Sequence, residues 1–271
     1  MGKKVRVKDI LHVLNQFAPP SLAEDWDKVG LQVGTIKAPV EGVLVSLDVT
    51  EEVLQDCFKQ GANLLITHHP LFLRDLKRSD RLALPRRLIR SALRKRIQIL
   101  SFHTNLDSTE EGLNDLLSEK LDLKKVIPFL PAGGLRKTKA GLGRIGHIKK
   151  SKLKAFVRTV ARSLHLKNLR YVEVPRQSVR KVAVVTGSGA GFFREAKKAG
   201  ADVLVTGDVK YHTALEAMAE KIALVDVGHF ASEIGMVSLI AERLRLWSRQ
   251  RGLGLKIVAS KVQEDPFRFW P

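Results

Sequence analysis

The sequence contains an internal repeat, which limits the folds open to it. Residues 42–69 align with residues 181–208 without a gap, at an offset of 139. GVLVSL lies opposite KVAVVT, and FKQGANLLITHH lies opposite KKAGADVLVTGD. Each copy has the pattern of a strand, a helix, a Gly-Ala turn and a second strand that ends in a polar pair. The repeat predicts two related α/β lobes; the alternative is two ordinary strand–helix–strand units with chance similarity.

Short β-branched runs alternate with amphipathic segments along the rest of the chain. The predicted helices are 5–17, 50–60, 81–96 and 152–164, and the predicted strands are 42–49, 63–67, 97–102, 144–148, 169–174 and 181–186. This alternation is typical of an α/β fold with largely parallel sheets. Cys57 follows Val53 and Leu54 at helical spacing, so we expect its side chain to be buried.

The charge of the chain is strongly positive. Its 47 Lys and Arg and 28 Asp and Glu give a net charge of +19. Residues 124–172 contain 14 basic and no acidic residues, and residues 74–96 contain 10 basic and 2 acidic residues. Such a field attracts nucleic acid, nucleotides and phosphorylated metabolites. A solvated helix face carries the same signal, and the basic stretches lack the interleaved aromatic residues that stack on bases.

The cysteine content and the hydropathy restrict the setting of the protein. The single cysteine, Cys57, excludes a disulfide within the chain and every Cys-rich zinc module. No apolar run reaches the roughly 18 residues that a membrane span needs. The segment MGKKVRVKDI lacks the apolar stretch of a signal peptide. We therefore expect a cytoplasmic protein that does not associate with membranes.

Polar residues gather where four predicted strands end. Five of the eight histidines follow the strands 63–67, 97–102, 202–206 and 222–227, together with three carboxylates. They are His68, His69, His103, His212 and His229, with Asp107, Asp208 and Glu233. Ligands of open α/β sheets bind at the carboxyl ends of the strands. His, Asp and Glu without Cys indicate a divalent ion such as Zn, Mn, Fe, Co or Mg.

The spacing within these turns suits metal binding. His68 and His69 are adjacent, so they point to different sides of an extended chain and can serve two ions, or one ion and one outer hydrogen bond. His229 and Glu233 are four residues apart and can face one site over the first turn of a helix. A carboxylate can bridge two ions about 3.5–4 Å apart. For any single histidine, the alternative is an ordinary surface or core role, and the other three histidines are assigned to it.

Two glycine-rich segments are candidates for phosphate sites. Gly141–Gly146 fits GxGxxG but precedes the strand-like HIKK rather than a helix, which argues against a dinucleotide site. Gly187–Gly191 follows a strand and opens a helix, so its amides could hold an oxyanion. The alternative for GSGAG is a tight turn with close packing. The acidic residues around Trp26 either shape a pocket or belong to a solvated loop.

Several motifs resemble those of a known family. THHPLF, SFHTNLD, GADVLVTGD-x-x-YH and GHFASE, with EDWDKVGLQVG and GSGAGF, are similar to motifs of the Nif-three-like dinuclear metal-centre family, whose members carry the name GTP cyclohydrolase 1 type 2 homolog. The resemblance covers nearly the whole chain. Many members insert a large domain between the two halves. Only about 75 residues separate Asp107 from the second repeat, so the resemblance implies the short form.

The resemblance implies a dinuclear metal centre. Its ligands, carried over to this chain, are His68, His69, Asp107, His229 and Glu233. The implied cofactors are two divalent ions per chain, of Zn, Fe, Mn or Co. Members often form ring-like hexamers, so a homohexamer is expected.

The fold implied by the resemblance is α/β, with two interlocked three-layer lobes, mostly parallel or mixed sheets and the metal site at their interface. We expect residues 1–128 and 228–271 to form the first lobe and residues 129–227 the second, because GHFASE must reach the HHP and HTNLD turns.

We interpret the chain as a metal-dependent hydrolase. Two ions would activate a water for attack on a nucleotide or a phosphoester-like anionic substrate. Asp208 or His212 would act as a general base or proton shuttle, and His103 would orient a ligand. The family name is a label and not evidence of an activity. The alternative is a non-catalytic regulatory protein, in which the metal pair organises the lobes and the basic surface binds nucleic acid or a protein partner.

Overall fold

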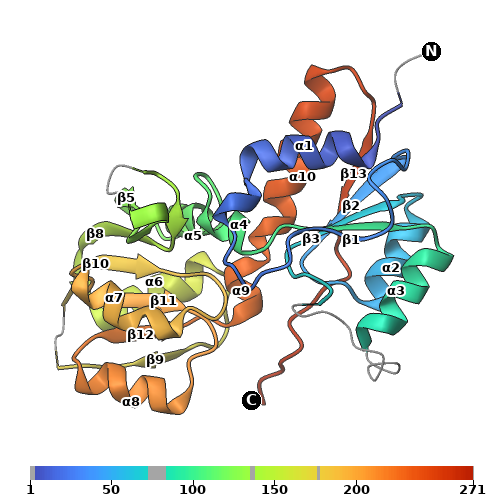
Figure 1. The fold of residues 1–271 in the computed structure, drawn as a ribbon. Coiled ribbons are helices and arrows are strands. Elements are labelled where there is room, and N and C mark those ends of the chain that lie inside the picture. Colours follow the sequence, from blue (N-terminus) through green and yellow to red (C-terminus); the bar gives the residue numbers. More distant parts are fainter. Residues whose placement is uncertain (1–3, 73–83, 135–137, 176–177, 271) are drawn as a thin grey trace. The chain divides into compact units, whose positions relative to one another are not determined.

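The chain divides into two compact units, each of which contains its own sheet (Figure 1). The computed structural model describes residues 4–72, 84–134, 138–175 and 178–270. The first unit is Met1–Leu106 with Met236–Glu264, and the second is Asp107–Gly235 with Asp265–Pro271. The chain thus returns to the first unit after the second. The predicted lobes share this crossover but differ in their limits, since residues 107–128, 228–235 and 265–271 belong to the second unit.

The first unit is built on a five-stranded sheet of order β1–β4–β3–β2–β13. β1 is antiparallel to β4, and the other pairs are parallel. The strands are β1 (Gly30–Val33), β2 (Gly42–Ser46), β3 (Leu64–Thr67), β4 (Gln98–Ser101) and β13 (Lys256–Ala259). The helices are α1 (Val7–Phe17), η1 (Pro20–Leu22), α2 (Glu51–Lys59), α3 (Leu84–Arg94) and α10 (Gly235–Gln250). The start of the predicted helix 81–96 lies outside the described residues.

Helices cover both faces of this sheet, as the three-layer prediction requires. Leu44, Leu65 and Ile99 lie opposite one another on β2, β3 and β4 and pack against α2 and α3. Figure 1 shows α1 and α10 on the other side of the sheet. Cys57 of α2 is fully buried in the core, and burial raises the pKa of its thiol to about 12. The side chain therefore behaves as the small hydrophobic group that was predicted.

The second unit is built on a six-stranded mixed sheet of order β5–β8–β10–β11–β12–β9. β10, β11 and β12 are parallel, whereas β5, β8 and β9 pair antiparallel with their neighbours. The strands are β5 (Lys124–Ile127), β8 (Arg144–Lys152), β9 (Arg170–Val172), β10 (Ser178–Val184), β11 (Val203–Thr206) and β12 (Ala223–Asp226). β6 (Leu130–Pro131) and β7 (Gly141–Leu142) form a separate small pair.

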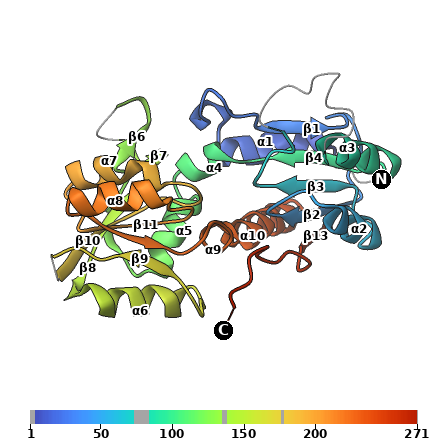
Figure 2. The same ribbon diagram turned by 90° about the horizontal axis from the view of Figure 1, so that it is seen from below.

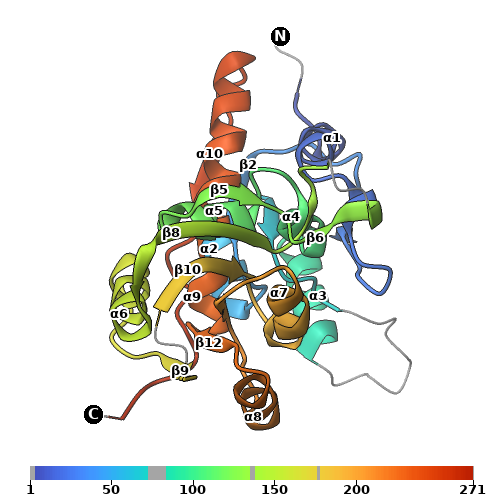
Figure 3. The same cartoon turned by 90° about the vertical axis from the view of Figure 1, so that its left-hand side faces the viewer.

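The second sheet also lies between two layers of helices. The helices are α5 (Leu113–Lys120), α6 (Leu153–Ser163), α7 (Phe193–Lys198), α8 (Tyr211–Ala219) and α9 (His229–Glu233), with α4 (Thr104–Ser108) and the short turns η3 (Ala132–Gly134) and η4 (Ala190–Phe192). Figures 2 and 3 show α6 on one side of the sheet and α7 on the other, where Figure 2 also shows α8. Within the described residues, no helix has the length and apolar character that a membrane span requires.

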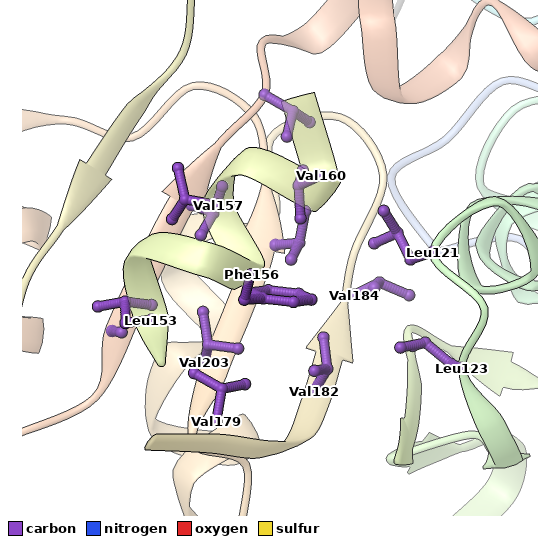
Figure 4. Close-up of a cluster of buried hydrophobic side chains, with 14 of the residues drawn as sticks. Leu121, Leu123, Leu153, Phe156, Val157, Val160, Val179, Val182, Val184 and Val203 are labelled. Atoms are coloured by element: carbon purple, nitrogen blue, oxygen red, sulfur yellow. The ribbon is translucent and has the colours of Figure 1, made fainter. Parts of the chain in front are cut away.

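One face of the second sheet forms a buried aliphatic cluster (Figure 4). Val182, Val184 and Val203 of the sheet pack there with Phe156 of α6. The cluster also includes Leu117 of α5, together with Leu121 and Leu123, which follow that helix. These leucines bury their side chains in the second core, which is why the segment 107–128 belongs to this unit rather than to the predicted first lobe.

The internal repeat is visible in the register of the strands. Leu44 lies opposite Leu65 in the β2–β3 pair, and Ala183 lies opposite Leu204 in the β10–β11 pair. Both pairs keep the offset of 139 found in the sequence.

The turns of the two copies also match. In the first copy, the main-chain amide of Glu41 donates a hydrogen bond to Asn63 Oδ1 at 2.9 Å. In the second copy, the amide of Arg180, at the equivalent position, donates to Asp202 Oδ2 at 2.8 Å. The agreement supports two related units over chance similarity.

Candidate metal centre

Three histidines gather at one edge of the first sheet. His68 and His69 follow β3 directly, and His103 stands two residues after β4. β3 and β4 are parallel neighbours, so their carboxyl ends lie side by side. Each side chain offers one ring nitrogen, and these three atoms all lie within 4.8 Å of one another. The group is compact enough to hold a divalent ion through imidazole nitrogens.

The first two rings are oriented by oxygen atoms at Nδ1. His68 is fully buried, and its Nδ1 lies 2.8 Å from the carbonyl oxygen of Phe102. Because a carbonyl oxygen only accepts, Nδ1 carries the hydrogen, and Nε2 of the neutral ring keeps its lone pair. His69 Nδ1 lies 2.7 Å from Asp48 Oδ1. Both contacts therefore favour Nε2 as the metal-binding atom.

The third ring is held by a buried carboxylate. His103 Nδ1 lies 2.9 Å from Asp27 Oδ1, and Asp27 Oδ2 accepts hydrogen bonds from the amide and the hydroxyl of Thr104 at 3.0 and 2.6 Å. Burial by itself would raise the pKa of Asp27, but the hydrogen bonds from His103 and Thr104 and the charge of His103 outweigh it and lower the pKa to about 2. Asp27 is therefore ionised at neutral pH and fixes the orientation of His103.

The second unit brings a histidine and a glutamate into contact on α9. His229 Nε2 lies 3.0 Å from Glu233 Oε2, one helical turn away. His229 Nδ1 lies 2.7 Å from Asp208 Oδ2, which repeats the arrangement of His69 with Asp48. Glu233 is only 3% exposed. An imidazole nitrogen and a carboxylate oxygen so close together are the donor types that bind Zn, Fe, Mn or Co.

Asp107 is fixed by a small hydrogen-bond network in the second unit. Its Oδ1 accepts a hydrogen bond from Thr186 Oγ1 at 3.0 Å, and its main-chain carbonyl accepts one from Asn114 Nδ2 at 3.0 Å. Asn114 Oδ1 in turn accepts from the Thr186 amide at 3.0 Å. The carboxylate is buried and is held beside the turn that follows β10.

The GSGAG turn packs against α9. The amide of Gly187 donates to Ser232 Oγ at 2.9 Å, and the amide of Gly189 donates to Thr206 Oγ1 at 3.0 Å. A Cβ atom on Gly187 would lie 2.2 Å from Glu233 Oε1. Both amides are engaged by the protein itself, so the turn serves close packing, and the oxyanion interpretation is not supported.

The structure defines the surroundings of the other predicted site residues. The carboxylate of Asp208 contacts Nδ1 of His229, a contact that orients the ring. His212 is exposed in the first turn of α8, with its ring centroid 5.4 Å from that of Tyr211. His103, which was predicted to orient a ligand, also belongs to the three-histidine group, and its predicted role stays a prediction. The catalytic roles of Asp208 and His212 stay predictions.

Sequence reasoning missed the carboxylates behind two of the rings. Asp48 stands two residues after β2, the parallel neighbour of β3, so the strand-end rule that found His68 could also have found it. Asp27 lies in the EDWDKVG segment, where a pocket and a solvated loop were both considered. Its side chain is in fact buried on His103, and no local pattern pairs residues so far apart in the chain.

The donor set fits a divalent metal. Nitrogen donors dominate in the first unit, and a nitrogen–carboxylate pair stands in the second, without thiolates. Each of the four rings has an oxygen partner at Nδ1, as metal-binding histidines usually have.

The fold and these residues define a class: two-unit α/β proteins with histidines and carboxylates at the ends of parallel strands. The sequence model of Duf34/NIF3 (NGG1p interacting factor 3) matches residues 5–266. The chain belongs to the Duf34/NIF3 family.

This chain is similar to several known proteins over nearly its full length. The GTP cyclohydrolase 1 type 2 homolog of Clostridium perfringens is 35% identical over 268 residues, which cover 98% of this chain and 100% of that protein. The protein of the same name from Bacillus subtilis is 28% identical over an alignment of 373 positions, longer than this chain, as the short form predicts. A crystal structure of a Bacillus cereus protein related to NIF3 has a TM-score of 0.91 at 27% identity and covers 99% of this chain and 100% of that chain.

Proposed function

We propose that this protein is a metal-dependent hydrolase of a nucleotide or another phosphoester-like anionic substrate. The proposed ligands of its two divalent ions are His68, His69, Asp107, His229 and Glu233, with His103 as a further ligand. One observation carries the proposal: in all four of these histidines, Nδ1 faces a carbonyl or carboxylate oxygen. Such a partner fixes the ring and makes Nε2 a better ligand.

The residues of the proposed site would have different roles. A bound divalent ion supplies Lewis acidity and lowers the pKa of water toward neutrality. Asp48, Asp27 and Asp208 hold the histidine rings in position. Asp107 and Glu233 contribute the negative charge that offsets the repulsion between two dications. The net charge of +19 favours an anionic substrate.

Metal content per chain tests the ligand set. We expect the wild-type protein to keep two ions after dialysis and His68→Ala or Glu233→Ala to lose at least one, because each removes a proposed donor. Asp27→Asn should bind the same number of ions at saturating metal concentration. Its affinity for metal should fall by roughly 10–100-fold, as it does when the hydrogen-bond partner of a ligating histidine is replaced. Elemental analysis and metal titration measure both.

His165→Ala, which removes an exposed histidine of the second unit, is the matched control. Two ions retained in Glu233→Ala would contradict the ligand assignment. The hydrolase proposal itself fails if no nucleotide or phosphoester is turned over with Mn, Zn, Fe or Co, or if turnover survives Glu233→Ala.

An exposed basic surface supports a second candidate function, the binding of a polyanion such as nucleic acid. β5 pairs with β8, and α6 follows β8 directly. Their exposed cations are Lys124, Lys125, Lys149, Lys150, Lys152, Lys154, Arg158 and Arg162. Residues 124–172 contain no acidic residue, and the carboxylates of Asp122 and Glu173, just outside this stretch, pair within the described residues with Lys124 and Lys154 alone.

Binding of a duplex DNA oligonucleotide tests this candidate. We expect affinity to fall steeply between about 50 and 200 mM salt, because bound phosphates release counterions. Lys149→Glu with Lys150→Glu should weaken binding further. Lys8→Glu with Lys59→Glu changes the net charge equally on exposed residues of the first unit and serves as the control in fluorescence anisotropy. Affinity that is insensitive to salt, or equal losses in both variants, would argue against a defined surface.

A further inference from the structure

A cavity of about 400 Å³ lies in the second unit, beside His229 and Asp208. Its walls come from three parts of the chain: the segment that leads into β9, the residues after β11 and β12, and the C-terminal segment 265–269. Figure 3 shows the C-terminal end of the chain near β9. The volume falls within the range of small-molecule sites, roughly 300–1,000 Å³.

One wall presents a fixed cation. Arg170 Nη2 donates to Asp226 Oδ2 and, at 3.3 Å, to the carbonyl oxygen of Val209. Asp226 is nearly buried and also accepts from the amide of Gly228 at 3.1 Å, so the guanidinium is attached to the end of β12. The side chain of Arg170 is nevertheless 73% exposed. A guanidinium has five N–H donors, and these contacts use one nitrogen, so it suits a further, anionic partner.

Another part of the lining presents aromatic rings. Phe267 and Phe269 line the cavity from the C-terminal segment and are 74% and 62% exposed, and Phe230 of α9 lines it as well. The segment is shaped by its own hydrogen bonds, from the Phe267 amide to Asp265 Oδ1 at 2.9 Å and from Arg268 to the Asp265 carbonyl. Exposed phenyl faces offer a stacking surface for a planar ring.

We propose that this cavity binds a planar aromatic anion, with its ring against Phe267 and Phe269 and its anionic group at Arg170. The C-terminal segment is then the element that selects an aromatic substrate over other anions. The inference rests on the proposed function in one respect: His229 and Asp208 are part of the cavity wall, so the bound ligand would lie next to proposed metal-site residues.

Calorimetric binding of AMP, adenosine and ribose 5-phosphate to the full-length, chelator-treated protein tests the proposal. We expect AMP to bind at least about tenfold more tightly than either fragment, since each fragment lacks one of the two recognised groups. Phe267→Ala with Phe269→Ala should weaken AMP by about tenfold or more, as loss of base stacking does. Arg170→Gln should weaken AMP and ribose 5-phosphate but leave adenosine unchanged.

Trp270→Ala is the matched control, because Trp270 is 96% exposed and lies next to the segment without lining the cavity. The proposal is overturned if AMP binds no better than ribose 5-phosphate, if Trp270→Ala weakens AMP as much as the phenylalanine variant, or if that variant changes only the oligomeric state. Metal uptake is measured separately, on wild-type protein that has not been treated with chelator. A wild-type protein that takes up metal but binds no AMP overturns this inference alone, whereas AMP binding by a wild-type protein that takes up no metal overturns the proposed function alone.

Discussion

Replacement of Gly187 by alanine is expected to abolish binding of at least one metal ion. The new Cβ would lie 2.2 Å from Glu233 Oε1 and 3.4 Å from His229 Nε2, so the glutamate must leave its position. Gly187 also has φ of +63°, where an alanine costs about 1–2 kcal/mol of backbone strain. Elemental analysis after dialysis measures the metal loss, and thermal unfolding in chelator measures the strain.

Gly191→Ala is the matched control for this experiment, within the same GSGAG turn. A Cβ at Gly191 meets no atom within 4 Å, and its φ is not in the left-handed region. The control should therefore keep wild-type metal content. If Gly187→Ala bound two ions, metal binding would not require the Glu233 carboxylate at its present position.

Replacement of Arg144 by alanine is expected to destabilise the fold by about 3–5 kcal/mol, because it removes the buried arginine of an ion pair with the partly exposed Asp115 and leaves buried carbonyl acceptors without their donor. Arg144 is 1% exposed, and its Nε and Nη2 donate to the two carboxylate oxygens of Asp115 at 2.6 and 2.7 Å. It also donates to the carbonyls of Gly141 and Thr109 at 2.6 and 2.7 Å. Without it, these acceptors lose a buried donor.

Denaturant unfolding of the chelator-treated protein measures this effect. Arg144→Lys should be intermediate, since a lysine keeps the charge but loses the two-pronged contact with Asp115. The loss for alanine is a large part of the roughly 5–15 kcal/mol that stabilises a typical protein. A change below about 1 kcal/mol would mean that Asp115 and the carbonyls are satisfied without the guanidinium.

The same arginine explains the GxGxxG segment, which precedes a strand rather than the helix that a dinucleotide site needs. A Cβ on Gly141 would lie 2.3 Å from the Leu130 carbonyl, and a Cβ on Gly143 would lie 2.2 Å from the ring of Phe129. The main chain thus passes close to its neighbours, and the carbonyls of both glycines accept from Arg144 Nη1. These glycines serve the packing of a buried arginine.

Local patterns were sufficient to predict most of the two sheets. The β-branched runs at 63–67 and 97–102 became β3 and β4, and the offset of 139 carried over into the strand registers. Hydrophobic periodicity and the steric preferences of glycine act over a few residues, so they can be recognised in the sequence. The positions of His68, His69 and His229 at strand ends were predictable for the same reason, because the end of a parallel strand is itself a local feature. Their role as metal ligands stays a prediction.

Tertiary structure decided the rest. The pairing of Asp27 with His103, of Asp48 with His69 and of Arg144 with Asp115 joins residues that no local period relates. The assignment of α5 to the second core, and of residues 265–269 to the wall of a cavity, depends on tertiary contacts that no local pattern specifies. The sequence alone determined which histidines and carboxylates stand at the ends of the strands. Only the folded chain determined which oxygen atom orients each ring, because a hydrogen bond depends on positions within a few tenths of an ångström and these are set by the packing of the whole unit.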